Sequence, residues 1–225
     1  MHPDDLSFRD RADAGRQLVP HLMVYATRNP VILALPRGGV PVAFEVSRAL
    51  RASLDLVFVR KIGAPDHAEF GLGAVMDGAH PQVVLNDEAL GHVKVPPGYI
   101  EEETQRQLKE IERRREHYLA GRQAIDVAGR VVIVVDDGVA TGGTVRAALK
   151  GLARARPVRL ILAVPAAPAD TIDRLRAEAD ELICLMTPEP FYAVGEHYGD
   201  FSQTSDREVT TLLDKARLWS REDAS

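Results

Sequence analysis

Residues 131–144 constrain the fold of this chain more than any other part of its sequence. An apolar run, Val131–Val135, leads into Asp136 and Asp137, and the next seven residues are only Gly, Val, Ala and Thr. A short run that is apolar on both faces is typical of a parallel strand covered by helices. The residues that follow repeat at the spacing of one helix face: Val145, Ala148, Leu149 and Leu152. The segment therefore predicts a buried strand, a tight turn and a helix.

Other short apolar runs share this pattern and are separated by helical segments. They are Val31–Leu35, Leu54–Val59, Leu160–Val164 and Glu181–Leu185. An opening helix is expected from about Phe8 to Arg28, and a last helix follows the capping box Ser205-x-x-Glu208. This alternation predicts an α/β fold in which helices flank a central parallel sheet, with right-handed crossovers.

The middle of the chain departs from the alternation. Residues 61–98 hold Gly, Pro and short apolar pieces, with one short strand expected at Gln82–Leu85. Residues 100–118 form a helical pattern in which Glu and Arg are interleaved, which favours a solvated face over a nucleic-acid contact. The opposite face of this helix holds Ile100, Thr104, Leu108 and Ile111.

We expect a single domain over residues 1–225, a length that can bury a full core without disulfides or metals. Neither an internal repeat nor a low-complexity linker divides it. Its expected parts are a core, a lid with a helical insertion, and a small C-terminal hood that joins the N-terminal segment. The core spans about residues 28–60 and 128–187, the lid with its helical insertion spans about 61–127, and the hood spans about 188–205.

Composition excludes several classes of protein. Hydrophobic residues make up 45% and charged residues 27%, which excludes a disordered chain, a collagen and a disulfide scaffold. The net charge of −5 and the 5% aromatic content argue against a nucleic-acid partner. Cys184 is the single cysteine, so it cannot form an internal disulfide and is expected in the core. The histidines are scattered, which argues against a structural zinc site. The first residues are acidic, whereas a signal peptide begins with basic residues, and no apolar run approaches the ~18 residues of a membrane span. These features favour a cytoplasmic protein without a membrane partner.

The turn after the central strand has the features of a phosphate site. The free N–H groups and the dipole of a helix start attract an anion, and the hydroxyls of Thr141 and Thr144 add donors. Gly142 and Gly143 let the backbone approach a phosphate closely. The spacing fits neither a Walker A motif nor a dinucleotide-binding glycine motif.

The carboxylates of Asp136 and Asp137 would repel a phosphate, but they can accept hydrogen bonds from sugar hydroxyls. Both lie where a strand ends, and ligands of open α/β sheets bind at that edge. The segment therefore predicts a sugar-phosphate site. The alternative is an ordinary strand, turn and helix with aspartates near the helix N-cap.

A family resemblance rests on one ordered motif, Asp136-Asp137-x-x-Ala140-Thr141-Gly142-Gly143-Thr144. It resembles the site for 5-phosphoribosyl 1-pyrophosphate (PRPP) in type I phosphoribosyltransferases, most closely in the adenine-specific branch. The resemblance implies that family's α/β fold, with Asp136 and Asp137 as the catalytic pair that holds the ribose hydroxyls. It also implies that residues 140–144 hold the 5-phosphate.

The segment Leu35–Pro41 fits the same family. It resembles the loop that holds pyrophosphate through backbone N–H groups, here at Gly38 and Gly39. Arg37 would add a charge-assisted hydrogen bond to the anion. Taken alone, the Pro-x-Gly-Gly pattern also marks ordinary turns.

The end of the second predicted strand carries two adjacent cations, Arg60 and Lys61. They resemble the Arg-Lys pair with which several family members contact pyrophosphate, and they would lie at the same sheet edge. The alternative is a solvated pair at a strand end. Residues 63–73 then occupy the position of the family's mobile lid, with glycine hinges and with Glu69 and His67 as candidates for proton transfer to or from the base.

The C-terminal stretch Pro188–Phe201 resembles the part of 6-oxopurine phosphoribosyltransferases that covers the base. The resemblance implies that Phe191 stacks on the base with Tyr192 beside it. It also implies that Asp200 supports a metal through water. The alternative is a small satellite core beneath a long loop.

Two departures affect the base half of the site. The 6-oxopurine enzymes have an Asp at the position of Ala140 and a Lys near the end of the next strand, whereas residues 164–168 offer no Lys. The phosphate half looks complete and the base half is mixed. The chain looks closest to predicted phosphoribosyltransferases whose acceptor is unassigned.

The resemblance implies a Mg²⁺-dependent enzyme of nucleotide salvage. It would transfer the 5-phosphoribosyl group from PRPP to a nitrogenous base and release pyrophosphate, with purine favoured by residues 136–144 and Phe191. One alternative is a PRPP-binding sensor without turnover, and another is hydrolysis of a sugar phosphate at the same site. The helix of residues 100–118 could supply a homodimer contact.

Overall fold

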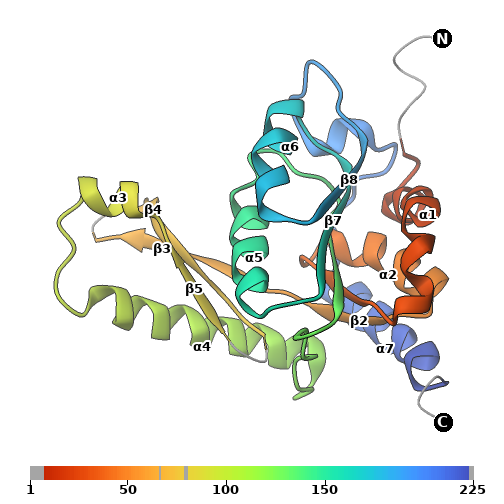
Figure 1. The fold of residues 1–225 in the computed structure, drawn as a ribbon, viewed down its shortest axis with the longest axis horizontal. Coiled ribbons are helices and arrows are strands. Elements are labelled where there is room, and N and C mark those ends of the chain that lie inside the picture. Colours follow the sequence, from red (N-terminus) through yellow and green to blue (C-terminus); the bar gives the residue numbers. More distant parts are fainter. Residues whose placement is uncertain (1–7, 66, 79–80, 223–225) are drawn as a thin grey trace.

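The computed structural model describes residues 8–65, 67–78 and 81–222, with the side chains at 68, 69, 87 and 220–222 left undescribed. A five-stranded sheet forms its centre, in the order β2-β1-β6-β7-β8, and every neighbouring pair is parallel (Figure 1). The strands are β1 Val31–Ala34, β2 Ser53–Leu56, β6 Val131–Val135, β7 Arg159–Ala166 and β8 Glu181–Met186. Each coincides with an apolar run of the sequence, which confirms the predicted central sheet.

Helices cover both faces of this sheet, as its apolar strands require. They are α1 Arg11–Leu22, α2 Gly39–Leu50, α5 Gly143–Arg154, α6 Ala169–Leu175 and α7 Asp206–Glu222, with the short 3₁₀ helices η2 Met23–Arg28 and η3 Arg176–Glu178. Alternate residues of β6 face opposite layers. Ile133 packs in the cluster that includes α1, α2 and α7, whereas Val132 and Val134 pack in the cluster with α5 and α6. The predicted opening helix is thus present, although it changes to 3₁₀ geometry after Leu22.

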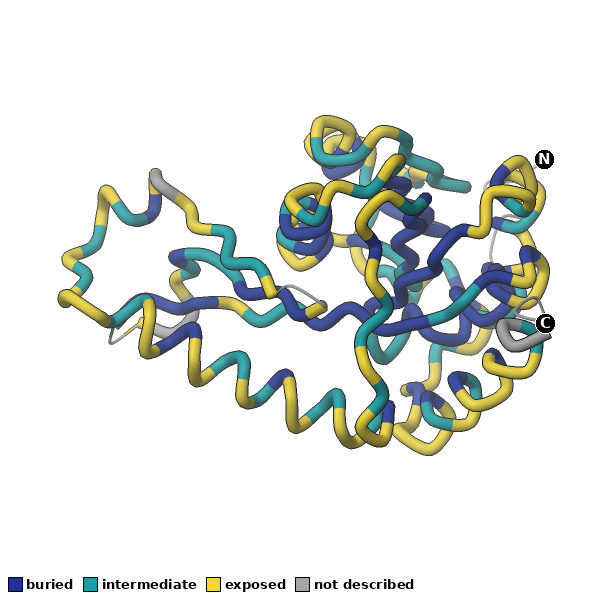
Figure 2. Tube along the Cα trace, turned by 60° about the horizontal axis from the view of Figure 1, so that its bottom comes forward, coloured by how far each residue is buried: buried dark blue, intermediate teal, exposed yellow. Residues whose placement is uncertain are grey.

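The middle of the chain forms an arm that projects from the core (Figures 1 and 2). Its antiparallel sheet has the order β3-β4-β5, and two helices accompany it. The elements are β3 Val59–Ala64, β4 His67–Met76, β5 Gln82–Leu85, α3 Asp87–His92 and α4 Tyr99–Leu119. The strand expected at 82–85 and the helix expected at 100–118 are both confirmed.

The segment expected to be the lid forms a hairpin of β3 and β4. Residues 63, 64 and 67–73 lie in these two strands, and Leu72 is fully buried. Glycine serves close packing here: a Cβ on Gly73 would lie 2.4 Å from the carbonyl oxygen of Val84 on β5. A glycine-rich segment can therefore be a strand where a neighbouring strand approaches closely.

Arg115 of α4 ties the arm to the core. Its guanidinium lies 3.0 Å from Oδ2 of Asp55 on β2 and 2.7 Å from Oδ2 of Asp77, which follows β4. Asp77 also accepts a 2.7 Å hydrogen bond from the backbone N–H of Phe58. Burial raises the pKa of Asp77 to about 6, although Arg115 opposes that shift. A buried network of charged side chains thus attaches the arm to the core.

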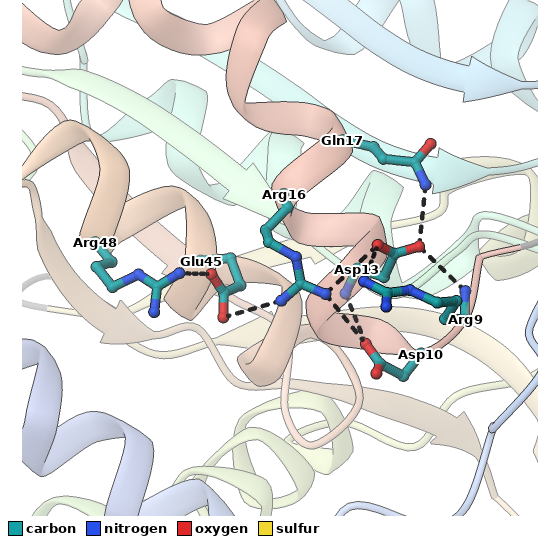
Figure 3. A network of polar contacts seen from close by, with 7 residues as sticks. All are labelled: Arg9, Asp10, Asp13, Arg16, Gln17, Glu45 and Arg48. Atoms are coloured by element: carbon teal, nitrogen blue, oxygen red, sulfur yellow. Dashed lines mark hydrogen bonds and ion pairs between the residues drawn. The ribbon is translucent and has the colours of Figure 1, made fainter.

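Polar contacts hold α1 against α2. Figure 3 shows Arg16 of α1 between Asp13 and Glu45, at 3.4 Å and 3.7 Å. The side chain of Asp10 caps α1 by accepting a 2.7 Å hydrogen bond from the N–H of Asp13. These contacts fix the first turn of α1, which contains Arg11.

The hood, residues 188–205, packs on the first described residues of the chain. Phe8 forms a parallel β-bridge with Tyr198, and their rings lie 5.3 Å apart. Phe191 and Phe201 pack against the same apolar cluster, and the 3₁₀ helix η4 Val194–His197 lies between them in sequence. Among the residues given a structure, no helix is long and apolar enough to cross a membrane.

Candidate functional site

Two loops meet at the carboxyl edge of the central sheet. Because β1 and β6 are paired neighbours, residues 35–38 and 136–137 leave the sheet side by side. The loops are so close that a Cβ on Gly38 would lie 2.0 Å from Oδ2 of Asp137. The fold thus brings together two motifs that the sequence predicts to share a site, and only glycine fits at this contact.

The two carboxylates of the motif are in different surroundings. Asp136 is half-buried, and its Oδ1 accepts a 2.9 Å hydrogen bond from the N–H of Asp137. Burial, and after it the charge of Asp137, raise the pKa of Asp136 well above its ordinary value. Adjacent carboxyl groups in a low-dielectric site resist double ionisation.

Arg11 of α1 is a member of this site that the sequence patterns do not indicate. Its Nε donates a 2.7 Å hydrogen bond to Oδ2 of Asp137. Its Nη1 donates to the Ser202 carbonyl at 2.6 Å, and its guanidinium carbon lies 3.9 Å from the centre of the Phe201 ring. The Arg11 and Asp137 side chains are only 11% and 15% exposed. Arg11 is therefore held between the carboxylate and the hood.

The hood also contacts the loop through Tyr198, whose hydroxyl donates a hydrogen bond to the carbonyl of Asp137. Burial is the main cause that raises the pKa of Tyr198. The hydroxyl therefore stays protonated and keeps its role as donor. Together with Arg11, this contact fixes both the backbone and the side chain of Asp137.

Residues 140–144 form the turn that begins α5. Thr141, Gly143 and Thr144 line a cavity of about 680 Å³ between α5 and the sheet of the arm. Within the described chain, none of the N–H groups of residues 140–144 has a backbone acceptor. The hydroxyl of Thr171 on α6 donates a 2.9 Å hydrogen bond to the carbonyl of Ala140, which holds the turn against α6. Free N–H groups at a helix start are suited to an anion.

The predicted pyrophosphate loop differs in detail from expectation. The Gly39 N–H donates a 3.1 Å hydrogen bond to the Leu35 carbonyl, so it is used within the loop as α2 begins. That leaves the N–H groups of Arg37 and Gly38 for a ligand, because the described residues give them no backbone acceptor. The peptide bond between Pro36 and Arg37 is cis. The Arg37 guanidinium reaches toward α7, where its Nη1 lies 3.4 Å from Oδ1 of Asp206.

The sequence places Arg60 and Lys61 at the end of a strand of the central sheet, whereas the structure places them in the arm. The chain leaves the core sheet after β2, and both residues lie in β3 of the arm. Neighbours on a strand point to opposite faces. Accordingly, Arg60 Nε donates a 3.0 Å hydrogen bond to Gln107 of α4, whereas Lys61 lines the cavity beside Thr144. Of the two, Lys61 is the one beside the helix start of α5.

The two predicted proton-transfer residues lie on β4 of the arm. His67 is exposed there, and the side chain of Glu69 lies outside the described residues. The position of β4 is set by its pairing with β3 and β5, so the two residues belong to the arm's sheet and not to a loop.

The predicted base and metal residues all lie in the hood. Phe191 packs with its ring centre 5.0 Å from that of His197, while Tyr192 is 77% exposed. The Asp200 carboxylate accepts a 2.9 Å hydrogen bond from the Ser202 N–H, which lowers the pKa of Asp200. Phe191 thus packs in the apolar cluster of the hood, while Tyr192 is open to solvent.

The donor set at the sheet edge fits Mg²⁺ bound together with a substrate. Mg²⁺ takes oxygen ligands and is commonly held by one or two carboxylates, waters and substrate phosphates. Asp136 and Asp137 provide such carboxylates. Across residues 8–65, 67–78 and 81–222, no group of three or more His, Cys, Asp or Glu side chains could hold a metal ion. A cation here would therefore depend on ligands from the substrate.

Comparisons with known proteins identify the family of the chain. The family model of the phosphoribosyl transferase domain matches residues 11–198. A Mycobacterium tuberculosis (strain H37Rv) protein that bears the name "Putative phosphoribosyl transferase" is 45% identical over 211 residues, 93% of this chain and 47% of that protein. Its counterpart in strain CDC 1551 gives the same values. The chain thus spans about half the length of the curated relatives it matches.

A solved structure is also similar over nearly the whole chain. The crystal structure of TT1426 from Thermus thermophilus is 42% identical in sequence and has a TM-score of 0.81. The similarity covers 93% of this chain and 98% of that one. The arrangement of core, arm and hood is therefore shared with a protein of known structure.

Proposed function

The chain belongs to the phosphoribosyl transferase family, and on this premise we propose that it transfers the 5-phosphoribosyl group from PRPP to a nitrogenous base and releases pyrophosphate. One observation carries the proposal. The carboxylates after β6, the free helix start of α5 and the loop of residues 36–38 all lie at the carboxyl edge of one sheet. These groups match the parts of PRPP: a diol, a phosphate and a pyrophosphate.

Each group has a distinct role in this reaction. Asp137, oriented by Arg11, would accept hydrogen bonds from the ribose hydroxyls, and the N–H groups at the start of α5 would bind the 5-phosphate. The N–H groups of Arg37 and Gly38 would bind the pyrophosphate. Transfer from a sugar anomeric carbon passes through a transition state with oxocarbenium character. Positioning and stabilisation of the leaving pyrophosphate would therefore supply most of the catalysis.

The proposal includes Mg²⁺ as a cofactor that arrives with the substrate. Asp136 and Asp137 are the residues that would hold it beside the ribose hydroxyls. Its chemistry would be charge neutralisation on the departing pyrophosphate. Burial, and after it the charge of Asp137, raise the pKa of Asp136, and the charge of a bound cation would oppose that shift.

The residues around the site bear on which base accepts the phosphoribosyl group. The motif at 136–144 and the aromatic residues of the hood favour a purine. Ala140 supplies no carboxylate for a base proton, and residues 164–168 supply no Lys. This specific deficit also favours a second candidate function, a sensor that binds PRPP without turning it over.

A release assay distinguishes the two functions. The protein is incubated with PRPP, Mg²⁺ and a panel of purine and pyrimidine bases, and pyrophosphate is measured. The transfer proposal predicts release with at least one base, and loss of that release in Asp137→Asn. PRPP binding without release with any base would support the sensor. Release of pyrophosphate or phosphate without any base would instead indicate hydrolysis.

A further inference from the structure

A cationic pocket that includes Arg37 lies between α4 and the start of α7. Its volume is about 370 Å³, and the charged and hydroxyl-bearing residues that line it come from three separate segments. They are Arg37, Arg113, Arg114, His117, Tyr118 and Asp206. Asp206 is the one acidic residue of this lining, against three arginines, so the pocket has an excess of positive charge. We call it the α4–α7 pocket.

Asp206 occupies the position that an anionic ligand would take. Its carboxylate accepts a 2.6 Å hydrogen bond from the Tyr118 hydroxyl and lies 3.3 Å from Nε2 of His117. It also lies 3.4 Å from Nη1 of Arg37. The hydrogen bond from Tyr118 is the main cause that lowers the pKa of Asp206, so the carboxylate is charged at neutral pH. A single exposed carboxylate thus engages three donors from two segments.

The arginines of the pocket have donors for a larger anion. Glu110 accepts hydrogen bonds from Nε and Nη2 of Arg113 and from Nε of Arg114, which leaves the other N–H groups of these guanidiniums for a ligand. Each guanidinium carries five N–H donors in a planar fork that matches phosphate oxygens. Because Asp206 is 49% exposed and starts a helix, it can move aside without loss of core packing. A phosphate group could then bond to the donors that Asp206 uses now and to further ones.

The pocket is separate from the proposed PRPP site. None of residues 136–144 lines it, and it shares no lining residue with the cavity at the start of α5. It meets that site only through Pro36 and Arg37, next to the Gly38 that contacts Asp137. Moreover, Arg113, Arg114 and His117 all belong to α4, which lies outside the family motifs of the sequence.

We propose that the α4–α7 pocket is a subsite for a free phosphoanion, either inorganic pyrophosphate or the phosphate chain of a nucleotide, which displaces Asp206 from Arg37. The proposal goes beyond the proposed transfer, because an anion can bind here whether or not the chain turns over PRPP. Occupation would also change the partner of Arg37, and so would couple the subsite to the pyrophosphate loop.

Titration calorimetry without Mg²⁺ tests the proposal, with inorganic pyrophosphate and ATP as the probes. Asp206→Asn removes the competing charge and keeps the shape of the side chain, so the pocket should bind an anion more tightly. We expect at least about threefold tighter binding of the preferred probe, since exposed ion pairs each contribute up to about 1 kcal/mol. The double variant Arg114→Gln with His117→Gln should bind at least about fivefold more weakly.

Matched controls come from a second ion pair between the end of α4 and α7. Arg122 and Asp214 form it, outside the pocket, so Arg122→Gln and Asp214→Asn should leave the affinity unchanged. Thermal unfolding checks that every variant is folded. If ATP binds more tightly than pyrophosphate, the subsite is assigned to a nucleotide. If pyrophosphate binds as tightly as ATP or more tightly, the subsite is assigned to pyrophosphate. Either result supports the proposal.

Folded variants also give the result that would overturn it. If Asp206→Asn binds neither probe more tightly than the wild type, or if the Arg114 and His117 changes have no effect, the pocket is only a salt-bridge cluster. The proposed transfer fails separately, through absent PRPP binding. Asp137→Asn should weaken PRPP binding and leave the effect of Asp206→Asn on pyrophosphate binding in place.

Discussion

Arg11 and Asp137 lie 126 positions apart in the chain, yet Nε of Arg11 donates a 2.7 Å hydrogen bond to Oδ2 of Asp137. The contact joins the first turn of α1 to the loop after the central strand. Asp137 must be charged and correctly oriented to accept from a ribose diol. The partly buried guanidinium holds that orientation, because its hydrogen bond to Oδ2 is charge-assisted.

Replacing Arg11 should therefore weaken PRPP binding. Arg11→Gln removes a charge-assisted hydrogen bond, and we expect about a tenfold loss of PRPP affinity by calorimetry. Arg9→Gln is the matched control, because Arg9 is 77% exposed and pairs with Asp13, away from the site. Tighter PRPP binding in Arg11→Gln would show that Arg11 competes with the ribose and does not position Asp137.

Gly38→Ala should damage the site without unfolding the protein. The added Cβ would lie 2.0 Å from Oδ2 of Asp137, so the loop or the carboxylate must shift. We expect at least about a tenfold loss of PRPP affinity, because the shift breaks one charge-assisted contact. Gly91→Ala serves as control, since a Cβ there has nothing within 4 Å. Equal PRPP affinities in the two variants would contradict the close approach of the loops.

The arm depends on Arg115 for its attachment. Arg115→Met leaves the carboxylates of Asp55 and Asp77 buried, at 6% exposure each, without their shared cation. Removing one partner of a buried ion pair costs about 3 kcal/mol or more of unfolding free energy. Denaturant unfolding measures this loss, with Arg113→Met, at 69% exposure, as the control. A loss no larger than that of the control would mean that the network does not hold the arm.

Asp77 gives the stability a definite pH dependence. Its pKa is raised in the folded state from 3.8 to about 6, so between these values the folded chain binds more protons than the unfolded chain. The contribution of this group to stability therefore falls as pH rises from about 4 to 6. Asp77→Asn should lack that contribution, so the wild type should lose stability relative to it over this interval. Melting temperatures at pH 4, 5, 6 and 7 measure the difference, and a constant difference would contradict the raised pKa.

The sequence predicts most of the core because its signals are local. Apolar runs locate the five parallel strands, since strands covered by helices need such runs. The inner strands β1 and β6 are buried throughout, whereas the edge strand β8 is half-buried. The capping box also holds, because the Glu208 N–H donates a 3.1 Å hydrogen bond to Oγ of Ser205. The hairpin of β3 and β4 escapes prediction, because the glycines in it are read as the hinges of a lid and not as residues of closely packed strands.

The candidate site divides in the same way. The carboxylates and the helix start belong to one continuous motif, so residues 136–144 are predictable from their order alone. Arg11 is not, because it reaches the site from a helix far away in the chain. For the same reason the contact of Asp206 with Arg37 in the α4–α7 pocket is not predictable. The position of Arg60 and Lys61 in the arm escapes prediction for a related reason. The chain passes from one sheet to the other after β2, within a continuous apolar run that gives no sign of the change.

Calorimetric titration with PRPP and Mg²⁺ tests the central claim most directly, with the wild type and Asp137→Asn compared at pH 7.5. Asn keeps an acceptor for Arg11, so the variant should stay folded, as thermal unfolding can verify. The account predicts that the wild type binds PRPP and that the variant binds it about ten- to a hundredfold more weakly, the effect of losing one charged hydrogen-bonding partner. Equal affinity in the two proteins, or no PRPP binding by the wild type, would contradict it.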